Sequence, residues 1–335
     1  MSRPLVVVGG GSWGTALAIH ATRRGGEVRL WVHDPLLAES IRAGRENRSY
    51  LPGHRIPANL TIDADLARCV AGAGVVVLAV PSHHLRGVVR SLTPQLDRDT
   101  DVLVGTKGIE ADSLLRMSEV VHEESGIPDR HLAVLSGPSF AAEVAAGHPT
   151  AIVVAASDAG AGERMQRALS HSNLRLYRNP DVIGVEIGGA LKNVVAIAAG
   201  ILEGLDYGSN TAAALLTRGL HEITRLAVAL GGQRETLAGL AGMGDLVLTC
   251  GGRLSRNRQV GVALGRGESL AAILARMKMV AEGVRTSGAA VDLAQRVGVE
   301  MPIAERVAAV LFRELAPRDA IADLLARELK DETPL

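Results

Sequence analysis

The stretch LVVVGGGSWGT, residues 5–15, decides the fold of this 335-residue chain. A short apolar run is followed by the pattern G-x-G-x-x-G, and helix-forming residues come directly after it. In such a strand-loop-helix unit, Gly9 permits a tight turn, Gly11 lets the backbone approach a pyrophosphate, and Gly14 allows the helix to pack closely on the strand. The stretch therefore predicts a dinucleotide-binding loop.

Similar apolar runs recur through the first half of the chain, each ending at Gly, Pro, Ser or Asp. Runs of this kind are typical of parallel strands that are covered on both faces. The stretches between them, such as 15–24, 85–92 and 114–125, have helical patterns, so we expect an α/β domain with a doubly wound parallel sheet of the Rossmann type. The expected strands are 5–9, 28–32, 75–80, 102–105, 132–135, 151–155 and 174–177.

The pattern changes after residue 180, where apolar residues begin to recur at spacings of three and four. We therefore divide the chain into a dinucleotide-binding domain, 1–180, and an all-α substrate domain, 181–335. Glycine and proline breaks separate the expected helices. These helices are 181–202, 211–230, 235–241, 256–264, 269–276, 281–297, 303–314 and 317–329.

The charge balance and the cysteine count exclude several classes of protein. Lys and Arg number 36 and so do Asp and Glu, which gives no electrostatic reason to expect a nucleic acid or an anionic membrane as partner. The two cysteines, Cys69 and Cys250, argue against a disulfide scaffold and a zinc site, and favour a reducing cytoplasm. No signal peptide is expected, and the apolar stretch 182–202 carries charged residues and four glycines, so we expect a buried helix there and not a membrane span.

The end of the second strand bears on the choice of nucleotide. NAD-specific sites place an acidic residue there to bind the ribose 2′-hydroxyl. Here His33 takes that position and Asp34 follows it. Because a non-acidic residue removes the repulsion of a 2′-phosphate, we expect NADPH to be accepted, while Asp34 keeps NADH possible.

Lysine is rare in this chain, with Lys107, Lys192, Lys278 and Lys330 among 36 basic residues. Lys192 lies within a helix that is apolar almost all round, where an unpaired ammonium is costly. A lysine can lose its proton on burial, whereas an arginine keeps it. We therefore expect a functional Lys192; the alternative is a structural salt bridge to Glu186 or Asp245.

Several motifs together resemble a known family. They are 9–14, Thr106-Lys107-Gly108, 136–141, Gly188-Gly189-Ala190-Leu191-Lys192-Asn193, 241–245, Ser255-Arg256-Asn257 and 281–283, and they occur in the order and at the spacing of bacterial NAD(P)-dependent glycerol-3-phosphate dehydrogenase. The resemblance covers residues 6 to about 325. It implies a helical C-terminal domain like that of 6-phosphogluconate dehydrogenase, reduction of dihydroxyacetone phosphate to sn-glycerol 3-phosphate for glycerophospholipid synthesis, NADPH or NADH as cofactor, and a cytoplasmic homodimer.

The resemblance also implies roles for single residues. It places the proton donor and acceptor at Lys192, and it makes Lys192 a substrate contact too. The other substrate contacts that it implies are Lys107, Gly137, Ser139, Asp245, Ser255, Arg256 and Asn257. The cofactor contacts are Gly9, Gly11, Ser12, Trp13, Gly14, His33, Lys107, Gly137, Ser139, Ala141, Arg256, Val280 and Glu282, and no metal is expected.

The segment 255–257 predicts a phosphate site on its own residues. Ser255 is a suitable N-cap, but the third residue after it is Arg258, so no acidic side chain opposes the positive end of the helix dipole. An anion bound by Arg256 and Asn257 would fill that place. The alternative is a solvated arginine-rich turn.

Two other functions remain open at this point. A related two-domain dehydrogenase, such as a 2-ketopantoate or 3-hydroxyacid enzyme, also uses a helix lysine, and only the segment 255–257 distinguishes it. A non-catalytic redox sensor would bind NAD(H) but would need no buried titratable lysine.

Overall fold

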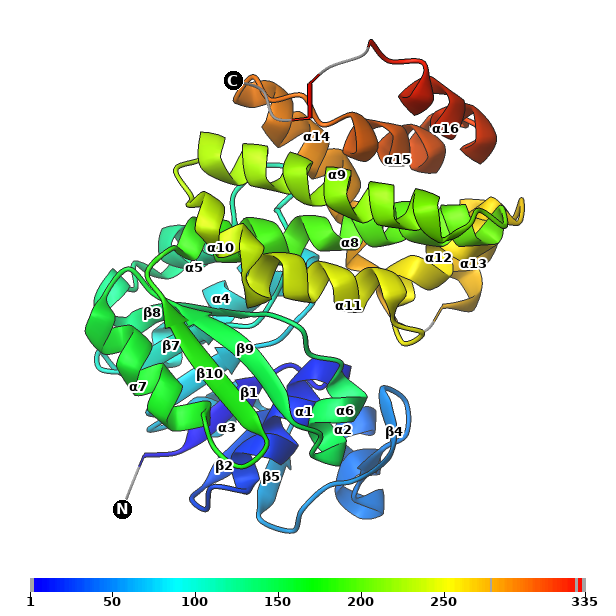
Figure 1. Ribbon diagram of the computed structural model, residues 1–335. Helices are drawn as coiled ribbons and strands as arrows, with labels where there is room; N and C mark the ends of the chain where they lie inside the picture. The colour runs from blue at the N-terminus through cyan, green and yellow to red at the C-terminus, as the bar shows by residue number, and fades with distance from the viewer. Residues whose placement is uncertain (1–2, 278, 329–330, 333–335) are drawn as a thin grey trace.

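The computed structural model describes residues 3–277, 279–328 and 331–332. Lys278 and Lys330 lie outside these residues. The N-terminal half forms a sheet with helices on both faces, and a layered group of helices sits above it (Figure 1). The chain leaves the last strand at Asn179 and enters the first helix of the second layer at Val182.

The main sheet has eight strands in the order β10-β9-β8-β7-β6-β1-β2-β5. All seven expected strands are present, and β5 is an eighth that the sequence pattern did not reveal. Their bounds are β1 Leu5–Val8, β2 Val28–Trp31, β5 Leu60–Asp63, β6 Val75–Leu78, β7 Asp101–Val104, β8 Leu132–Ser136, β9 Thr150–Ala155 and β10 Leu174–Asn179.

The sheet is mostly parallel, as expected, with one exception. Strand β9 pairs with β8 in the antiparallel direction, whereas β10 runs parallel to β9. The expectation of an entirely parallel sheet was therefore wrong at this pair. The connection between the two strands contains only the six-residue helix α6, Ala141–Ala146, and a parallel crossover normally needs a longer helix to carry the chain back along the sheet.

Helices and two apolar cores cover the two faces of the sheet. The three helices expected between strands are present, although the first begins at Ser12 and so includes the residues directly after Gly11. A small hairpin of β3, Glu46–Asn47, and β4, Leu51–Arg55, was not expected. The remaining elements are α1 Ser12–Thr22, α2 Pro35–Gly44, α3 Leu66–Val70, α4 Ser82–Leu92, η1 Thr93–Gln95, α5 Met117–Ser125, η2 Asp129–His131 and α7 Ala159–Leu169.

The described residues after 181 form helices around a third apolar core, and no strand occurs among them. The expected helices are present within a few residues, but α11, which carries Asp245, was missed because glycines interrupt its pattern. The bounds are α8 Val182–Gly204, α9 Ser209–Ala229, α10 Arg234–Ala238, the π-helix η3 Leu240–Gly244, α11 Asp245–Gly251, α12 Arg256–Gly265, α13 Leu270–Arg276, α14 Glu282–Arg296, α15 Pro302–Phe312 and α16 Pro317–Leu325.

Helix α8 lies at the centre of this second layer (Figure 1). It is long and apolar enough to cross a membrane by composition, but 78% of its most apolar window is buried inside the fold. It packs very closely on α12: a Cβ at Gly200 would fall 2.1 Å from the carbonyl oxygen of Arg258. The glycines of α8 thus serve contact between helix backbones, and the helix holds Lys192 inside the protein.

Candidate active site

The glycine loop has the geometry that a bound pyrophosphate requires. Gly9 has a φ of +128°, and a Cβ on Gly14 would fall 1.9 Å from the carbonyl oxygen of Gly9, so both positions need glycine. At Gly11, by contrast, a Cβ would meet nothing within 4 Å. This open space lies at the start of α1, whose first-turn N–H groups receive no side-chain cap. The loop therefore fits a dinucleotide.

The first turn of α1 carries two polar side chains, Ser12 and Trp13. Ser12 Oγ donates a hydrogen bond to the carbonyl oxygen of Tyr50 over 2.5 Å and lies 3.1 Å from Met279 Sδ. Trp13 Nε1 is buried and has no partner among the described residues. Tyr50 belongs to the hairpin connection that sequence analysis missed, since a hairpin with strands this short leaves no clear periodic signal.

His33 is placed at the end of β2, where the sequence predicted it. Its side chain is exposed and lies edge-on to Trp31, with ring centroids 5.6 Å apart. The carboxylate of Asp34 caps α2 by accepting from the backbone N–H of Leu36 over 2.9 Å. The carboxylate of Asp34, which follows His33 in the sequence, is thus already engaged, whereas the imidazole of His33 is exposed.

Two lysines from opposite halves of the chain meet at one carboxylate. Lys107, just after β7, donates to Asp245 Oδ2 over 2.7 Å, and Lys192 of α8 donates to Asp245 Oδ1. Asp245 opens α11 and is fully buried. Of the two partners suggested for Lys192, Asp245 is therefore the correct one. Glu186 binds Arg116 and Ser118 instead.

Burial and neighbouring charge change the proton affinity of this cluster. Burial lowers the pKa of Lys192 most, the carboxylate of Asp245 raises it and the adjacent ammonium of Lys107 lowers it, so that the pKa of Lys192 is about 7. The pKa of Asp245 stays below its ordinary value because the two ammoniums outweigh the cost of burying its charge. Lys192 is thus a buried acid that can exchange its proton near neutral pH.

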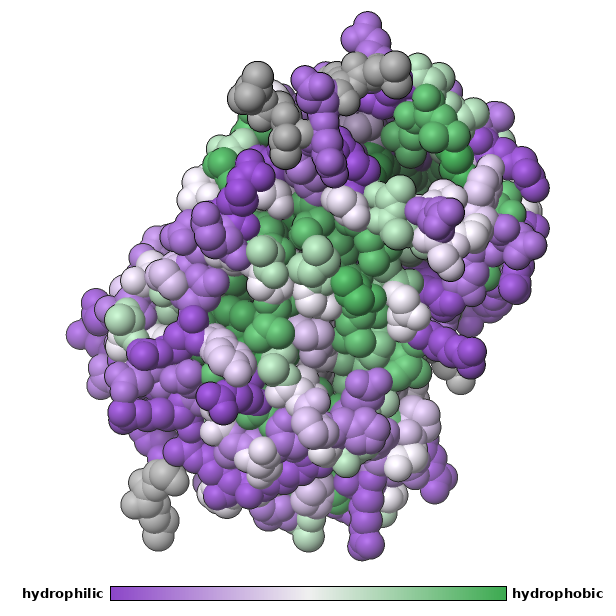
Figure 2. Space-filling model, in the orientation of Figure 1, coloured by the Kyte–Doolittle hydropathy of each residue, from purple (hydrophilic) through white to green (hydrophobic). Residues whose placement is uncertain are grey.

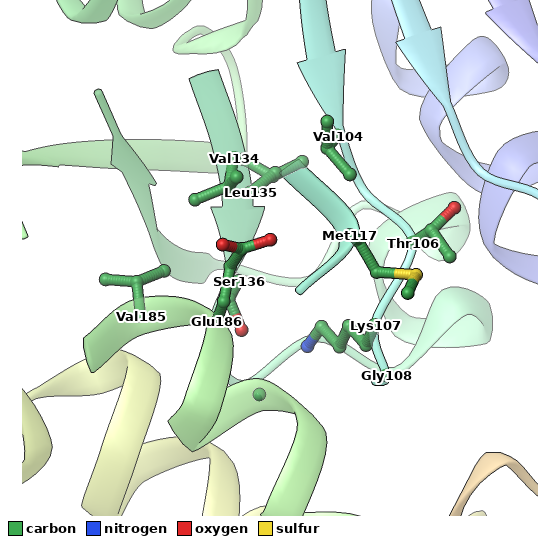
Figure 3. Close-up of a pocket in the computed structure, with 11 residues that line it drawn as sticks. Val104, Thr106, Lys107, Gly108, Met117, Val134, Leu135, Ser136, Val185 and Glu186 are labelled. Atoms are coloured by element: carbon green, nitrogen blue, oxygen red, sulfur yellow. The ribbon is translucent and has the colours of Figure 1, made fainter. Parts of the chain in front are cut away.

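The segment after β8 lies beside the lysines. The carbonyl oxygen of Gly137 accepts from Lys107 Nζ over 3.4 Å and from Ser139 Oγ over 2.9 Å. Ser136 Oγ is buried without a partner among the described residues, and it faces Gly189, one turn before Lys192. Figure 3 shows Lys107, Ser136 and Glu186 around a small pocket between the ends of β7 and β8 and the start of α8. The sequence placed Ser136 in a segment along this edge of the sheet but did not single it out as a site residue, and its position beside Gly189 shows that it lies close to Lys192.

The segment 255–257 begins α12 as predicted. Ser255 Oγ accepts from the backbone N–H of Arg258 over 3.2 Å, which confirms the N-cap. Arg256 is largely buried, and it makes no hydrogen bond or ion pair with a described residue; burial lowers the pKa of its guanidinium, and Glu282 partly restores it. Asn257 is more engaged than expected: its Nδ2 donates to Asn193 Oδ1 over 2.8 Å and its Oδ1 accepts from the N–H of Gly283 over 2.9 Å.

The start of α14 joins the two halves of the chain. Glu282 accepts from the backbone N–H of Ser82 over 3.1 Å and from its Oγ over 2.6 Å. Val280 is half-buried two residues earlier, and its neighbour Met279 contacts Ser12 as described above. Ala141 opens α6 at the end of the segment that follows β8. Contacts between residues far apart in the sequence therefore bring the starts of α1, α4 and α14 together. Among the described residues, no cluster of His, Cys, Asp and Glu could hold a metal ion.

Comparison with known proteins identifies the family. Models of the N-terminus and the C-terminus of NAD-dependent glycerol-3-phosphate dehydrogenase match residues 4–161 and 181–322. The chain belongs to this family. A glycerol-3-phosphate dehydrogenase [NAD(P)+] of Geobacter sp. (strain M21) is 50% identical over 334 residues, which cover 99% of each chain. A crystal structure of glycerol-3-phosphate dehydrogenase from Coxiella burnetii is 40% identical, covers 97% of this chain and 99% of its own, and has a TM-score of 0.93.

Membership of the glycerol-3-phosphate dehydrogenase family decides between the functions left open by the sequence. A ketopantoate reductase structure from Ralstonia eutropha shares only 16% identity with a TM-score of 0.62, which is a likeness of fold alone. The redox-sensor reading predicted no buried titratable lysine, and Lys192 contradicts it.

Proposed function

We propose that this chain reduces dihydroxyacetone phosphate to sn-glycerol 3-phosphate with NADH or NADPH. The observation that carries the proposal is the pair of the half-buried Lys107 and the buried Lys192, which share the carboxylate of Asp245. The glycine loop of the N-terminal half has open space for a dinucleotide at Gly11. The nicotinamide, when bound, supplies the hydride that reaches the carbonyl carbon.

The dinucleotide would bind along the C-terminal ends of the strands. Gly11 leaves open space for its pyrophosphate at the start of α1, while Gly9 and Gly14 allow the tight turn and the close helix packing that form the loop. Trp13, in the first turn of α1, is a further proposed contact. The remaining proposed contacts are Ser12, His33, Lys107, Gly137, Ser139, Ala141, Arg256, Val280 and Glu282. Since His33 is exposed and carries no negative charge that would repel a 2′-phosphate, the proposal includes acceptance of NADPH.

Lys192 is the proposed proton donor. Its ammonium gives a proton to the carbonyl oxygen of the substrate as the C–O group becomes an alkoxide, and it takes the proton back from the hydroxyl in the reverse reaction. A pKa near 7 suits both directions at neutral pH. Asp245 holds the ammonium in place, and Lys107 adds positive charge where the oxygen becomes negative.

Arg256 is the proposed anchor of the substrate phosphate. Its guanidinium is largely buried without a carboxylate partner in the described chain, and it stands on the first residue of α12, where the backbone N–H groups favour an anion. Gly137, Ser139, Ser255 and Asn257 are the other proposed substrate contacts. Asn257 contributes mainly by positioning, because Asn193 and Gly283 occupy its amide.

The substrate phosphate gives this assignment a direct test. Arg256→Ala should raise KM for dihydroxyacetone phosphate steeply while leaving the low activity on unphosphorylated dihydroxyacetone nearly unchanged. Arg253→Ala, at an exposed arginine three residues earlier, is the matched control and should behave like the wild type. Equal losses on both substrates in Arg256→Ala would contradict the phosphate role, because the side chain would then serve the chemistry or the folding.

The last part of the proposal concerns the location, the metabolic role and the oligomeric state of the enzyme. We infer that the enzyme works in the cytoplasm, supplies the backbone of glycerophospholipids, and forms a homodimer. Exposed apolar side chains on η3 and α11, namely Met243 and Val247, support association between copies, and Figure 2 shows hydrophobic residues gathered across the middle of this face. Sedimentation of the wild type and of Val247→Asp tests the dimer: equal masses would remove this surface from it.

A further inference from the structure

A second cluster of positive charge lies on α9, apart from the residues of the active site. Arg218, His221 and Arg225 are spaced by three and four residues, so they share one face of the helix. Arg234 opens α10, which folds back against the end of α9 through a hydrogen bond from the N–H of Gly232 to the carbonyl oxygen of Ala227 (Figure 1). We call these four residues the α9 cluster.

The arginines of the α9 cluster have no carboxylate partner. Within the described ranges, Arg218 and Arg234 make no ion pair and no side-chain hydrogen bond, and Arg225 donates only to the backbone carbonyl of Glu300, over 2.7 Å. This contrasts with arginines such as Arg86, which binds three glutamates. The α9 cluster therefore carries an excess of positive charge.

The neighbouring acids do not neutralise this charge. Glu222 follows His221 in the sequence, but its carboxylate accepts from the backbone N–H groups of Ile303 and Ala304 at the start of α15, over 2.8 and 3.4 Å. Glu235, beside Arg234, is exposed and forms no ion pair with a described residue. Within the described ranges, neither acid therefore forms an ion pair with the α9 cluster, although the charge of Arg225 reaches Glu222.

Two nitrogen atoms in the α9 cluster are also left without partners. Arg225 Nε and His221 Nδ1 are shielded from solvent, and neither has a hydrogen-bond partner among the described residues. Arg218, Arg225 and Arg234 all lie close enough to His221 to lower the pKa of its ring, which burial lowers most. Buried nitrogens without partners destabilise a fold, so the local structure around His221 and Arg225 is not fully satisfied within the described chain.

We propose that the α9 cluster binds the phosphate group of a phosphomonoester, at a site separate from the active site. A phosphomonoester is a dianion near neutral pH, and planar guanidinium groups bind two of its oxygens at once. Three guanidiniums around one imidazole match that charge better than they match a single carboxylate. The site is well placed to affect the enzyme: Gly219, next to Arg218, packs against Val195 of α8, one turn after Lys192.

Binding of labelled inorganic phosphate to the full-length protein tests this site by equilibrium dialysis. Because the active site should also bind phosphate, we expect two sites per chain in the wild type. Arg218→Gln should weaken one of them by about 10-fold or more, as expected for loss of a charged hydrogen-bond partner, while keeping turnover of dihydroxyacetone phosphate. Arg225→Lys keeps the charge and should weaken that site less.

Arg318→Gln is the matched control, since Arg318 is exposed on α16 and has no ion pair with a described residue. Equal phosphate affinities in Arg218→Gln and Arg318→Gln would overturn the proposal. So would a changed oligomeric state in Arg218→Gln with phosphate binding unaltered, because the α9 cluster would then be a contact between subunits. Co-sedimentation with phosphatidate vesicles, compared with phosphatidylcholine vesicles, shows whether the phosphate group comes from a lipid or from a soluble ester. Arg256→Ala should remove the phosphate site of the active site and leave the site of the α9 cluster intact. The proposed function and the proposal for the α9 cluster can therefore be refuted independently.

Discussion

Replacement of Asp245 by Asn isolates the electrostatic control of Lys192. Asp245 is buried between the ammoniums of Lys107 and Lys192, and the amide keeps its shape while removing its charge. Two unit charges about 4 Å apart interact by roughly 4 kcal/mol at an effective dielectric constant of 20. That energy corresponds to about 3 pKa units, and we take about 2 units as the expected decrease for Lys192.

The decrease translates into a loss of reductase activity that depends on pH. With a pKa of about 7, roughly a quarter of Lys192 is protonated at pH 7.5, and with a pKa of about 5 the fraction is roughly 0.3%. We therefore expect kcat/KM for reduction of dihydroxyacetone phosphate to fall by about 80-fold at pH 7.5. The activity should recover as the pH is lowered toward 5.5. Oxidation of glycerol 3-phosphate needs neutral Lys192 and should lose much less.

The assay is the pH profile of kcat/KM in both directions, followed by absorbance of the reduced nicotinamide. Nucleotide binding, measured by fluorescence, should survive the substitution. Asp101→Asn is the matched control, because Asp101 is also buried and paired, with Arg164 and His131, but lies outside the site. It should lower stability and leave the pH profile unchanged. If Asp245→Asn keeps the alkaline limb at its wild-type pH, the carboxylate does not set the proton affinity of Lys192 and the reasoning is wrong.

Three further predictions concern single positions. Lys192→Ala should lose about 10²–10⁴-fold in kcat. Lys192→Arg should not restore the activity, because a guanidinium keeps its proton, whereas Lys107→Arg should retain more activity than Lys192→Arg. Near-normal turnover in Lys192→Arg would show that positive charge alone suffices at this position. Gly11→Val should abolish nucleotide binding with an unchanged circular dichroism spectrum, since a Cβ there enters open space that the cofactor needs, and unaltered affinity would place the pyrophosphate elsewhere. Burial raises the pKa of the Glu222 carboxyl from 4.5 to about 7. The folded protein therefore holds the proton of Glu222 more tightly than the unfolded chain does. For this reason the free energy of unfolding should fall by about 3 kcal/mol as the pH rises from 4.5 to 7. Glu222→Gln should remove that part of the pH dependence in urea titrations, and an unchanged difference between pH 5 and pH 7.5 would show that Glu222 is not its source.

The sequence predicted the parts of the fold that depend on local pattern. Seven strands were found because apolar runs are typical of strands that are buried on both faces. Strand β5 was missed because it is as short as β1 and alternates buried with partly exposed residues. The long helices were found because their buried faces repeat every three to four residues. The hairpin of β3 and β4 and the short helix α11 were missed. Their residues number too few for a period to emerge, and glycines precede α11.

The candidate site divides in the same way. Lys192 was identified from the sequence because a charged side chain in an apolar helix is costly to bury without a partner. The glycine loop was identified because each glycine in its spacing serves a defined role in the turn, the pyrophosphate contact or the helix packing. The choice of Asp245 over Glu186 as the partner of Lys192 could not be predicted. Both acids were compatible with the pattern, and the choice depends on how α11 and α5 pack around α8.

By itself, the sequence determined that a dinucleotide loop opens an α/β domain, that a helical domain follows, and that Lys192 is buried. These properties follow from residue type and spacing, which act over a few turns of chain. Tertiary structure alone decided that Lys107 and Lys192 share one carboxylate, that Asn257 is tied to Asn193 and Gly283, and that strand β9 runs antiparallel to β8. The first two features are contacts between residues that are distant in the chain, and the strand direction depends on the path of the connection between β8 and β9. Such features are determined by how whole helices and strands pack, which a local sequence pattern does not encode.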